Sequence, residues 1–473
     1  MDICDSIFFK LSSNKLVKKL QAIIESQAKI IEAQAKTIVA LEARIVVLEA
    51  EIALLKNKKN SNNSSIPPSQ DQNRPRPNQS LRPATDRKPG GQPGHEGTTL
   101  LCSNQVDEVI KHSPAACSSC GIDLSNSPEV MVSSRQLIDI PPIVLRRIEH
   151  QVYKKQCSCG HTMQGSYPQH VATTVQYGPN IEALVGYLHA RQYLPYGRMQ
   201  ELLKDVMGVA LSVGGINNIL NRLAKKAMPI YDTIKERVEQ ASCIGADETG
   251  VNINGKNHWA WTWQNKQLTY IVCAASRGYK TVIETFSNGL PQAILVHDRW
   301  PSHFMMDAKG HQICTAHLLR DLNYINELYK NKCQWANDFK TLLQDAIQLK
   351  KQYTNTDYYY PDIKRQALFD QLQQLLALPI VEAHKKSKTL QKKLLAKKEC
   401  VLYFLLQPNV PPDNNGSERA IRNIKVKQKI SGQFKSLESA NVFATLRSII
   451  DTTNKAGNNI LKALKLIATF GTE

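Results

Sequence analysis

Two features that would direct a protein into or across a membrane are absent from this sequence. It contains no uninterrupted apolar run of about 18 residues, the length that a membrane-spanning helix needs. Near its start, Phe8-Phe9 is too short an apolar stretch for the hydrophobic region of a secretory signal. We therefore expect a protein of the cytoplasm, free or associated with the nucleoid, with no membrane partner.

Acidic residues are scarce relative to basic ones. The chain has 41 Asp and Glu against 60 Lys and Arg, a net charge of +19 over 473 residues. Such an excess favours a polyanionic partner, and nucleic acid is the usual one; the alternative is a solvated basic surface with no partner. An apolar content of 42% over this length is enough for several domains with buried cores.

The cysteines do not form the pattern of a disulfide framework. Their total, 11, is odd, and seven of them stand alone in the sequence. The other four form two close pairs, Cys117/Cys120 and Cys157/Cys159, each followed by glycine. Glycine suits the tight turn of a cysteine knuckle, and two knuckles supply the four sulfur ligands of one structural Zn²⁺. We therefore predict a small zinc-binding β module over 100–175.

Two details leave alternatives open for this module. The second pair has one residue between its cysteines instead of two, so His161 is a candidate to replace one ligand. Four unligated thiols are the other alternative. Strands are expected in stretches such as Ile143–His150.

The N-terminal segment 1–56 has a heptad repeat from residue 16 onward. Isoleucine and valine fill one position, and leucine fills most of the other, with Gln27 and Gln34 as the exceptions. The first series is Val17, Ile24, Ile31, Ile38, Ile45 and Ile52. This pattern favours a coiled coil that joins two or more copies of the chain; the alternative is an amphipathic helix packed on its own chain.

The middle of the chain divides by composition. Residues 57–99 are rich in Asn, Ser, Pro, Gln and basic residues, which predicts a flexible basic linker. Residues 176–239 have helical patterns, with Gly208 ending one helix and Ser212 capping the next. That arrangement resembles a DNA-binding helix-turn-helix, and a plain helical hairpin is the alternative.

From residue 240 to residue 473 the pattern changes to strands and then to helices. Three strands are expected over 242–249, 257–263 and 268–273, followed by a helix near Tyr279 and a buried strand over 293–298. Helices then continue to the end of the chain, with an insertion at about 330–408. The predicted fold class is therefore multidomain α+β.

Three acids occur at positions typical of a metal site. Asp247 and Asp298 each end an apolar strand, and Glu418 begins a helix after Pro411-Pro412. Parallel strand ends converge on a crevice, where a carboxylate needs water, a partner or a metal. This order resembles an RNase H-like α/β core, in which three carboxylates hold two Mg²⁺ or Mn²⁺ ions.

Each acid also has a plain structural interpretation. Asp247 can end a strand in a turn, Asp298 can cap the next helix, and Glu418 can belong to a capping box. Two nearby acids, Glu248 and Asp413, are easily mistaken for ligands. Because strand side chains alternate, we expect Glu248 to point to the sheet face opposite Asp247.

Several segments together resemble the insertion-sequence-66 family of bacterial transposases. They are Gly90–His95, Gly245–Gly250, His297-Asp298, Cys314–Arg320, Asn414–Arg422 and Lys425–Gly432. The resemblance implies a catalytic triad of two aspartates and a glutamate at Asp247, Asp298 and Glu418, with a helical insertion between the last two. The sequence departs from the family at Arg299, where a small residue is usual, and in the shortened second cysteine pair.

The resemblance also implies the function and the partner. Such an enzyme binds the terminal inverted repeats of its element, cleaves the DNA strands and joins the 3′-hydroxyl ends to target double-stranded DNA. Whether accessory proteins of the element take part is left open, and a non-catalytic DNA-binding copy and a nuclease of RNA are alternative functions. A basic face for DNA phosphates is expected at Arg419, Arg422, Lys425, Lys427 and Lys429.

Two further residues on the helix that follows the second acid are candidates for positioning DNA. They are His317 and Arg320. The basic face and these two residues have a common alternative, which is solvated helix surface. Trp259, Trp261 and Trp263 alternate along one strand and are expected to pack in the core or against a partner.

Overall fold

The computed structural model describes residues 2–56, 59–60, 63–64, 94, 96–97, 99–141, 143–168, 171 and 173–470. Most of the predicted linker 57–99 lies outside the described residues, as does the Gly90–His95 motif apart from Gly94. Within the described residues, no helix is both long enough and apolar enough to cross a membrane.

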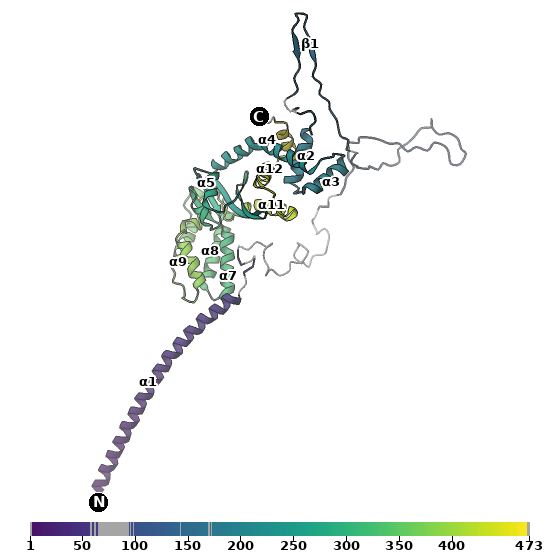
Figure 1. The fold of residues 1–473 in the computed structure, drawn as a ribbon. Coiled ribbons are helices and arrows are strands. Elements are labelled where there is room, and N and C mark those ends of the chain that lie inside the picture. The colour runs from purple at the N-terminus through teal and green to yellow at the C-terminus, as the bar shows by residue number, and fades with distance from the viewer. Residues whose placement is uncertain are drawn as a thin grey trace.

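A single helix of 55 residues, α1 (Asp2–Lys56), forms the N-terminal end and stands out from the body of the molecule (Figure 1). The heptad positions are exposed along it: Ile24 is 63% exposed, Ile31 65% and Ile38 56%. An exposed apolar stripe on a long helix favours packing against a partner. The sequence prediction of a helix is confirmed, and self-association remains a prediction.

The cysteine-containing segment is mostly extended chain. Among its described residues the only ladder is a short antiparallel pair, β1 (Lys154–Gln156) with β2 (Thr162–Gln164), on an arm that projects from the body (Figure 1). The stretch Ile143–His150, expected to be a strand, is not part of any sheet. The strand-like composition of this stretch is not sufficient, because among the described residues no neighbouring strand supplies the hydrogen bonds that a sheet needs.

Three helices follow the arm: α2 (Pro179–Ala190), α3 (Tyr196–Met207) and α4 (Val213–Glu239). The predicted stop and start signals are in place, because Gly208 is left-handed with φ 65° and the Ser212 hydroxyl accepts a hydrogen bond from the Gly215 amide. The buried residues of these helices belong to the same hydrophobic core as those of the sheet that follows.

The sheet has five strands in the order β5-β4-β3-β6-β7. The three strands β3, β4 and β5 form an antiparallel meander, while β6 pairs parallel to β3 and β7 parallel to β6. Their bounds are Cys243–Ile253, Lys256–Gln264, Thr269–Ala274, Leu290–His297 and Ala308–Ile313. The short helices α5 (Tyr279–Thr285) and α6 (Pro301–Phe304) connect β5 to β6 and β6 to β7.

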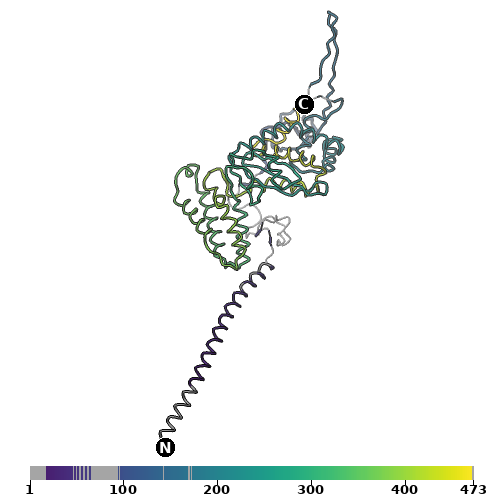
Figure 2. Tube along the Cα trace, turned by 60° about the vertical axis from the view of Figure 1, so that its left-hand side comes forward, coloured from purple at the N-terminus to yellow at the C-terminus, as the bar shows by residue number. Residues whose placement is uncertain are grey.

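The insertion has its own helical core. Its main helices are α7 (Thr315–Leu328), α8 (Gln334–Gln352), α9 (Ile363–Ala377) and α10 (Lys385–Leu395), followed by short 3₁₀ turns. Figure 2 shows this bundle beside the sheet-containing body. Leucines and aromatic residues of the bundle pack with Ile294, Val296 and Ile313 of the parallel strands, so the bundle is anchored on the sheet.

Three C-terminal helices return to the sheet: α11 (Asn415–Ser431), α12 (Leu437–Lys455) and α13 (Ile460–Ala468). Helix α12 covers the outer edge of β5, where the Ile271 amide donates to Ser448 Oγ at 2.9 Å and the Cys273 amide to Asn441 Oδ1 at 2.9 Å. Side chains of a helix therefore satisfy the free edge of the sheet. Helix α11 lies against β3 and β4 and carries the third acid.

Candidate active site

The strand register relates the positions of the first two acids. In the parallel pair of β3 and β6, Gly245 lies beside Val296, and Asp247 and Asp298 are each two residues further along. Side chains two residues apart on a strand share a face. Alternation therefore favours one face of the sheet for both carboxylates. The predicted strand end at Asp247 is wrong, because β3 continues through this residue to Ile253, whereas Asp298 directly follows the last residue of β6, as predicted.

The third acid reaches this face through the first turn of α11. The Asn414 side-chain amide donates to the Ala246 carbonyl at 2.7 Å, and the Ser417 hydroxyl donates to Asn414 Oδ1 at 2.6 Å. A side chain at Gly245 would meet both Asn414 and Ser417 at 2.7 Å. Glycine in β3 therefore allows the close approach that brings Glu418 to the strand carrying Asp247.

The charges of the three acids interact. Burial, together with the negative charges of Glu248, Asp298 and Glu418, raises the pKa of Asp247 well above its ordinary value. A half-buried carboxylate among others holds its charge only when a cation joins the group. Among the described residues, however, no three side chains of His, Cys, Asp or Glu already form a cluster that could hold an ion.

Glu418 has an alternative cation in this conformation. Arg320 Nη2 donates to Glu418 Oε1 at 3.3 Å, and His317 Nε2 lies 4.0 Å from the same oxygen. Burial and the charge of Arg320 lower the pKa of His317 to about 4, so His317 is neutral near pH 7 and Arg320 is the charged partner. These two residues lie beside the third acid, and their predicted role in positioning DNA stays a prediction.

Arg299, the departure from the family pattern after the second acid, forms its salt bridge with an acid outside the three. Its guanidinium forms a salt bridge with Asp321 of α7. Asp298 itself is fixed by its own loop, because the Trp300 amide donates to Asp298 Oδ1 at 2.8 Å. Arg299 thus ties the loop after β6 to the insertion without occupying the site.

Glu248 lies on the opposite face of the sheet, as the alternation predicted. There it faces Trp261 across β3 and β4 and is 1% exposed at its side chain. Its Oε1 accepts from Arg277 Nε at 2.8 Å, and its Oε2 contacts His303 Nε2 at 2.9 Å. Both oxygens are engaged, so Glu248 is not free to act as a metal ligand.

Comparison with protein families places most of the sheet-containing part of the chain in one family. Residues 174–442, more than half of the chain, match the Transposase IS66 family. The chain belongs to this family. A second match, over residues 15–100, is to a family of unknown function. No curated protein matches the chain.

The IS66 transposase family consists of DNA-processing enzymes of transposition, so the basic residues near Glu418 are of interest. Arg419, Arg422 and Lys429 on α11 are exposed. Lys427 differs from the prediction, because it is 4% exposed and donates to the Leu194 carbonyl at 3.2 Å. Burial lowers the pKa of Lys427 to about 8. It lies inside the fold, on the side of α11 that faces the helices before the sheet.

Lys425 is also engaged within the protein. Its ammonium donates to the Gly250 carbonyl at 2.5 Å. A helix turns about 100° per residue, so Lys425 lies on the same side of α11 as Arg422 and Lys429, whereas Lys427 lies well away from that side. Lys427 is therefore not part of an exposed basic surface, Lys425 lies on that surface half-buried with its ammonium bonded to the protein, and DNA binding by the exposed residues Arg419, Arg422 and Lys429 stays a prediction.

The tryptophans of β4 divide as expected between core and surface. Trp261 and Trp263 are fully buried and stack at 5.8 Å between ring centroids. Trp259 is only half buried, and the guanidinium of Arg277 lies 4.7 Å from its ring centroid. The buried pair forms the core of the sheet, whereas Trp259 belongs to the group around Glu248.

The two cysteine pairs have knuckle-like turns that remain apart. The Gly121 amide donates to the Cys117 carbonyl and the Gly160 amide to the Cys157 carbonyl, both at 2.9 Å, with positive φ at both glycines. Hydrogen bonds to neighbouring backbone amides lower the pKa of Cys117 and that of Cys157. Within the described residues the two pairs do not come together into one set of ligands.

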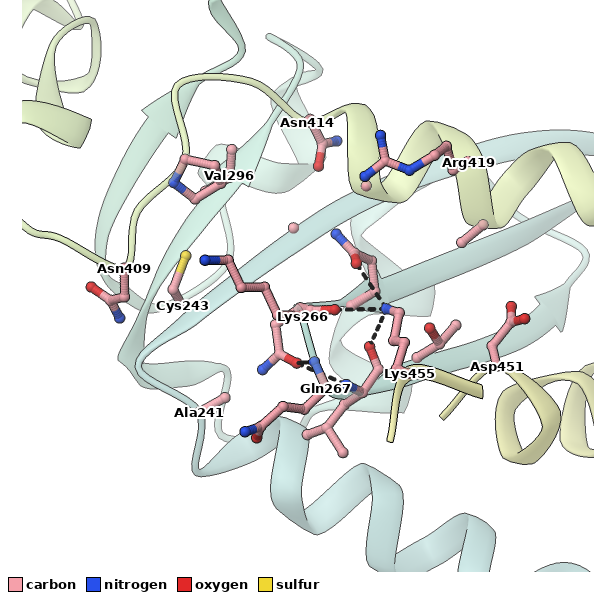
Figure 3. A pocket seen from close by; sticks show the side chains of 18 of the residues that line it. Ala241, Cys243, Lys266, Gln267, Val296, Asn409, Asn414, Arg419, Asp451 and Lys455 are labelled. Atoms are coloured by element: carbon pink, nitrogen blue, oxygen red, sulfur yellow. Dashed lines mark hydrogen bonds between the residues drawn. The ribbon is translucent and has the colours of Figure 1, made fainter. Parts of the chain in front are cut away.

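A pocket of about 950 Å³ lies beside the first turn of α11 (Figure 3). None of the three acids lines it. Its lining is rich in amides and includes Lys266 and Arg419, while Lys455 donates to the Asn265 carbonyl at 2.6 Å and to the Leu268 carbonyl at 2.8 Å. The pocket is therefore a polar cavity next to the helical turn that carries Glu418, and it is separate from the site of the three acids.

Sequence reasoning missed the group around Glu248. Arg277 lies in a loop and His303 in the short helix α6, neither within a recognisable motif, and neither was a candidate. The one available signal was Glu248 itself, an acid inside a buried strand directly after Asp247. Such an acid needs partners from elsewhere in the chain, and its neighbours in sequence do not identify them.

Proposed function

We propose that this chain is a transposase of the two-aspartate, one-glutamate type, with Asp247, Asp298 and Glu418 as its catalytic acids. It binds the terminal inverted repeats of its element, cleaves the DNA strands and joins the 3′-hydroxyl ends to target DNA. The observation that carries this proposal is the packing of α11 on β3, where the Asn414 side chain donates to the Ala246 carbonyl at 2.7 Å, so that the helical turn carrying Glu418 lies against the strand carrying Asp247.

The sheet supports an RNase H-like catalytic core. An antiparallel meander is followed by two parallel strands added on the side of β3, giving the order β5-β4-β3-β6-β7. The first acid lies on the first strand, the second follows the fourth strand, and the third lies on a later helix packed against the first. The proposed domain comprises 240–473, with the insertion at about 330–408.

The donor atoms suit Mg²⁺ or Mn²⁺, which prefer carboxylate oxygens. Two such ions held by the three acids would supply an activated oxygen nucleophile and stabilise the leaving oxygen. Without metal ions, the positive charge of Arg320 balances the negative charge of Glu418. Bound metal ions would take over this role. His317 is neutral near pH 7. Its Nε2 lies 4.0 Å from Glu418 Oε1, and the negative charge of Asp298 also acts on its pKa.

DNA would be held by the exposed basic residues of α11 and by the helical segment 176–239. Arg419, Arg422 and Lys429 lie on the helix that carries Glu418, so phosphates that they bind are brought to the acids. In the helical segment, the N-terminal end of α4 is exposed and preceded by the Gly208 turn, an arrangement that resembles a recognition helix.

The remaining parts of the chain would assemble the complex. The exposed heptad stripe of α1 supports pairing of two or more copies, so that two element ends are processed together. The two cysteine turns support one structural Zn²⁺ held by Cys117, Cys120, Cys157 and Cys159 after the arm has closed. An enzyme of this kind works on the chromosome and would be associated with the nucleoid.

The experiment that tests the substrate compares three nucleic acids at equal concentration with Mg²⁺. They are duplexes that carry the element's terminal repeats, duplexes of scrambled sequence, and RNA–DNA hybrids. We expect strand cleavage at the end of the terminal repeat and joining of its 3′-hydroxyl to a second duplex. Tight binding without cleavage in either Mg²⁺ or Mn²⁺ would indicate a non-catalytic DNA-binding protein. Preferential cleavage of the hybrid would indicate an RNA nuclease.

A further inference from the structure

The face of the sheet opposite the catalytic acids contains a fully engaged buried carboxylate. Glu248 lies directly after Asp247 in β3, and its side chain is 1% exposed. Arg277 donates two hydrogen bonds to Oε1, from Nε at 2.8 Å and from Nη2 at 2.7 Å, and His303 Nε2 lies 2.9 Å from Oε2. The bonds to Arg277 and His303 lower the pKa of Glu248 more than burial raises it, so the carboxylate is charged.

The arginine in this group is fixed by aromatic rings. Its guanidinium lies 3.7 Å from the ring centroid of Trp300 and 4.7 Å from that of Trp259. Trp300 belongs to the loop that follows the second acid, and its backbone amide donates to Asp298 Oδ1 at 2.8 Å. A guanidinium stacked in this way has one orientation, and it connects Glu248 to the residue that holds Asp298.

A second connection runs through the histidine. His303 is 1% exposed, and its Nε2 lies 4.0 Å from Asp298 Oδ1 as well as 2.9 Å from Glu248. The ring packs edge-on against Trp261, at 5.7 Å between centroids. Glu248 therefore reaches Asp298 by two routes: through Arg277 and Trp300, and through His303.

Stability alone does not explain a buried charge at this position. A buried ion pair is often no more stabilising than apolar residues of the same volume, because removing the charges from water offsets their attraction. What a fully bonded network does provide is a fixed geometry. Here it fixes the loop between β6 and β7, the loop that carries Asp298.

We propose that Glu248 is a positioning residue for Asp298, holding that carboxylate toward the acid face through Arg277, Trp300 and His303. The proposal rests on the assignment of Asp298 as a catalytic acid. Outer partners of this kind orient metal ligands, and their loss weakens metal binding by about 10- to 100-fold. Glu248 itself contacts no substrate in this arrangement.

The test measures binding of Mn²⁺ alone to the full chain, from the electron paramagnetic resonance signal of the free ion. In Glu248→Gln one oxygen replaces two, so either Arg277 or His303 loses its acceptor. We expect the Kd for Mn²⁺ to rise about 10- to 100-fold. Asp298→Asn is the reference for loss of the ligand itself and should bind Mn²⁺ more weakly still.

The matched control is Glu182→Gln. Glu182 is also a buried acid with two basic partners, Arg222 Nη2 at 2.5 Å and Lys226 Nζ at 3.1 Å, but it lies in the helical segment before the sheet. Both Glu→Gln variants should lower the melting temperature, because each leaves buried cations with a weaker acceptor. Only Glu248→Gln should change the affinity for Mn²⁺.

Three outcomes overturn the proposal in distinguishable ways. If Glu248→Gln binds Mn²⁺ as the wild type does while Asp298→Asn loses it, Glu248 is structural and the catalytic assignment stands. If Glu182→Gln weakens Mn²⁺ binding equally, the effect is one of general stability and the positioning role is rejected. If Asp298→Asn binds Mn²⁺ normally, Asp298 is no ligand and both the catalytic assignment and the positioning role fail.

Discussion

Burial and neighbouring acids destabilise the ionised carboxylate of Asp247, and a bound metal ion would remove this destabilisation. This carboxylate is half buried beside three other acids, and its Oδ1 accepts one hydrogen bond, from the Glu248 amide at 2.9 Å. Because the pKa of Asp247 is raised in the folded protein, the native state binds a proton more tightly than the unfolded chain. Without metal, this site therefore destabilises the fold increasingly as the pH rises above the ordinary carboxyl pKa, at about pH 4.

Asp247→Asn should remove this destabilisation. In the presence of a chelator at pH 7, we expect the variant to melt at a higher temperature than the wild type, and the difference to shrink as the pH falls toward about 4. Asp413→Asn is the control, because Asp413 accepts a hydrogen bond from the Asn415 amide at 3.0 Å and does not contribute to the shift at Asp247. Equal melting temperatures at pH 7 would contradict the account. Differential scanning calorimetry gives both values.

Two lysines on α11 should behave in opposite ways. Lys429 is exposed, whereas Lys427 is 4% exposed and bonded to backbone carbonyls. Lys429→Gln should reduce the slope of log K against log salt for duplex DNA by about 0.9 for the lost phosphate contact, with an unchanged melting temperature. Lys427→Gln should lower the melting temperature and leave that slope unchanged. The reverse pattern would mean that α11 meets DNA with its other face.

At the scale of elements, periodic segments could be predicted and short polar ones could not. The helices α7 and α11 and the strands β4 and β6 lie within a few residues of their predicted positions, because apolar periodicity and caps mark them. Helix α4 and strand β3 begin as predicted but extend further, to Glu239 and Ile253. Strand β7 was missed, since Ala308–Ile313 contains Lys309, Gly310 and His311 and has no apolar alternation. It exists because β6 offers it a parallel edge to pair with.

The candidate site was predictable to a similar degree. Predicted strand ends and a helix start identified the acids, since those positions follow from local pattern. The partners of these acids follow from packing between distant elements. Arg320 reaches Glu418 across 98 residues, and Arg277 reaches Glu248 across 29. No local pattern specifies such pairs, so the sequence did not reveal that His317 and Arg320 lie beside Glu418.

A charged side chain at an apolar heptad position of α1 should weaken the association of this helix with a second copy of the chain. Ile31→Asp places a carboxylate at a heptad position that is 65% exposed in the single chain. Burying one isoleucine contributes about 1.5–3 kcal/mol, so losing one from each of two helices should raise the Kd of association about a hundredfold or more. Sedimentation equilibrium measures this. Lys29→Asp, on the outer side of the repeat, should leave the oligomer intact, and dissociation by both variants alike would reject the seam.

The cysteine arm should contain one Zn²⁺ for each chain. Elemental analysis of the purified protein should give one equivalent of zinc, and Cys120→Ser should lose it, because three ligands hold the ion less well than four. His161→Ala should retain the zinc if all four ligands are cysteines. Protein that contains no zinc, with all four thiols reacting rapidly, would instead support free cysteines.

At the scale of the whole molecule, the catalytic assignment depends on how α11 returns to the sheet. The chain leaves β6 at Asp298, passes through the insertion and comes back 120 residues later at Glu418. The return is fixed at both sides of the first turn of α11: the Thr315 amide donates to the Pro412 carbonyl at 3.0 Å, and Asn414 donates to the Ala246 carbonyl at 2.7 Å. Hydrogen bonds from the start of α7 and to strand β3 thus fix the position of the helical turn that carries Glu418.

The most direct measurement is joining of a terminal-repeat duplex to target DNA in Mg²⁺ by four single variants. Metal ions at such a site stabilise the transition state by several kcal/mol, so Asp247→Asn, Asp298→Asn and Glu418→Gln should each lose at least about a hundredfold in rate. Asp413→Asn, an acid in the same turn as Glu418, should join DNA at the wild-type rate. Undiminished joining by any of the three variants, with DNA binding intact, would contradict a site shared by these acids.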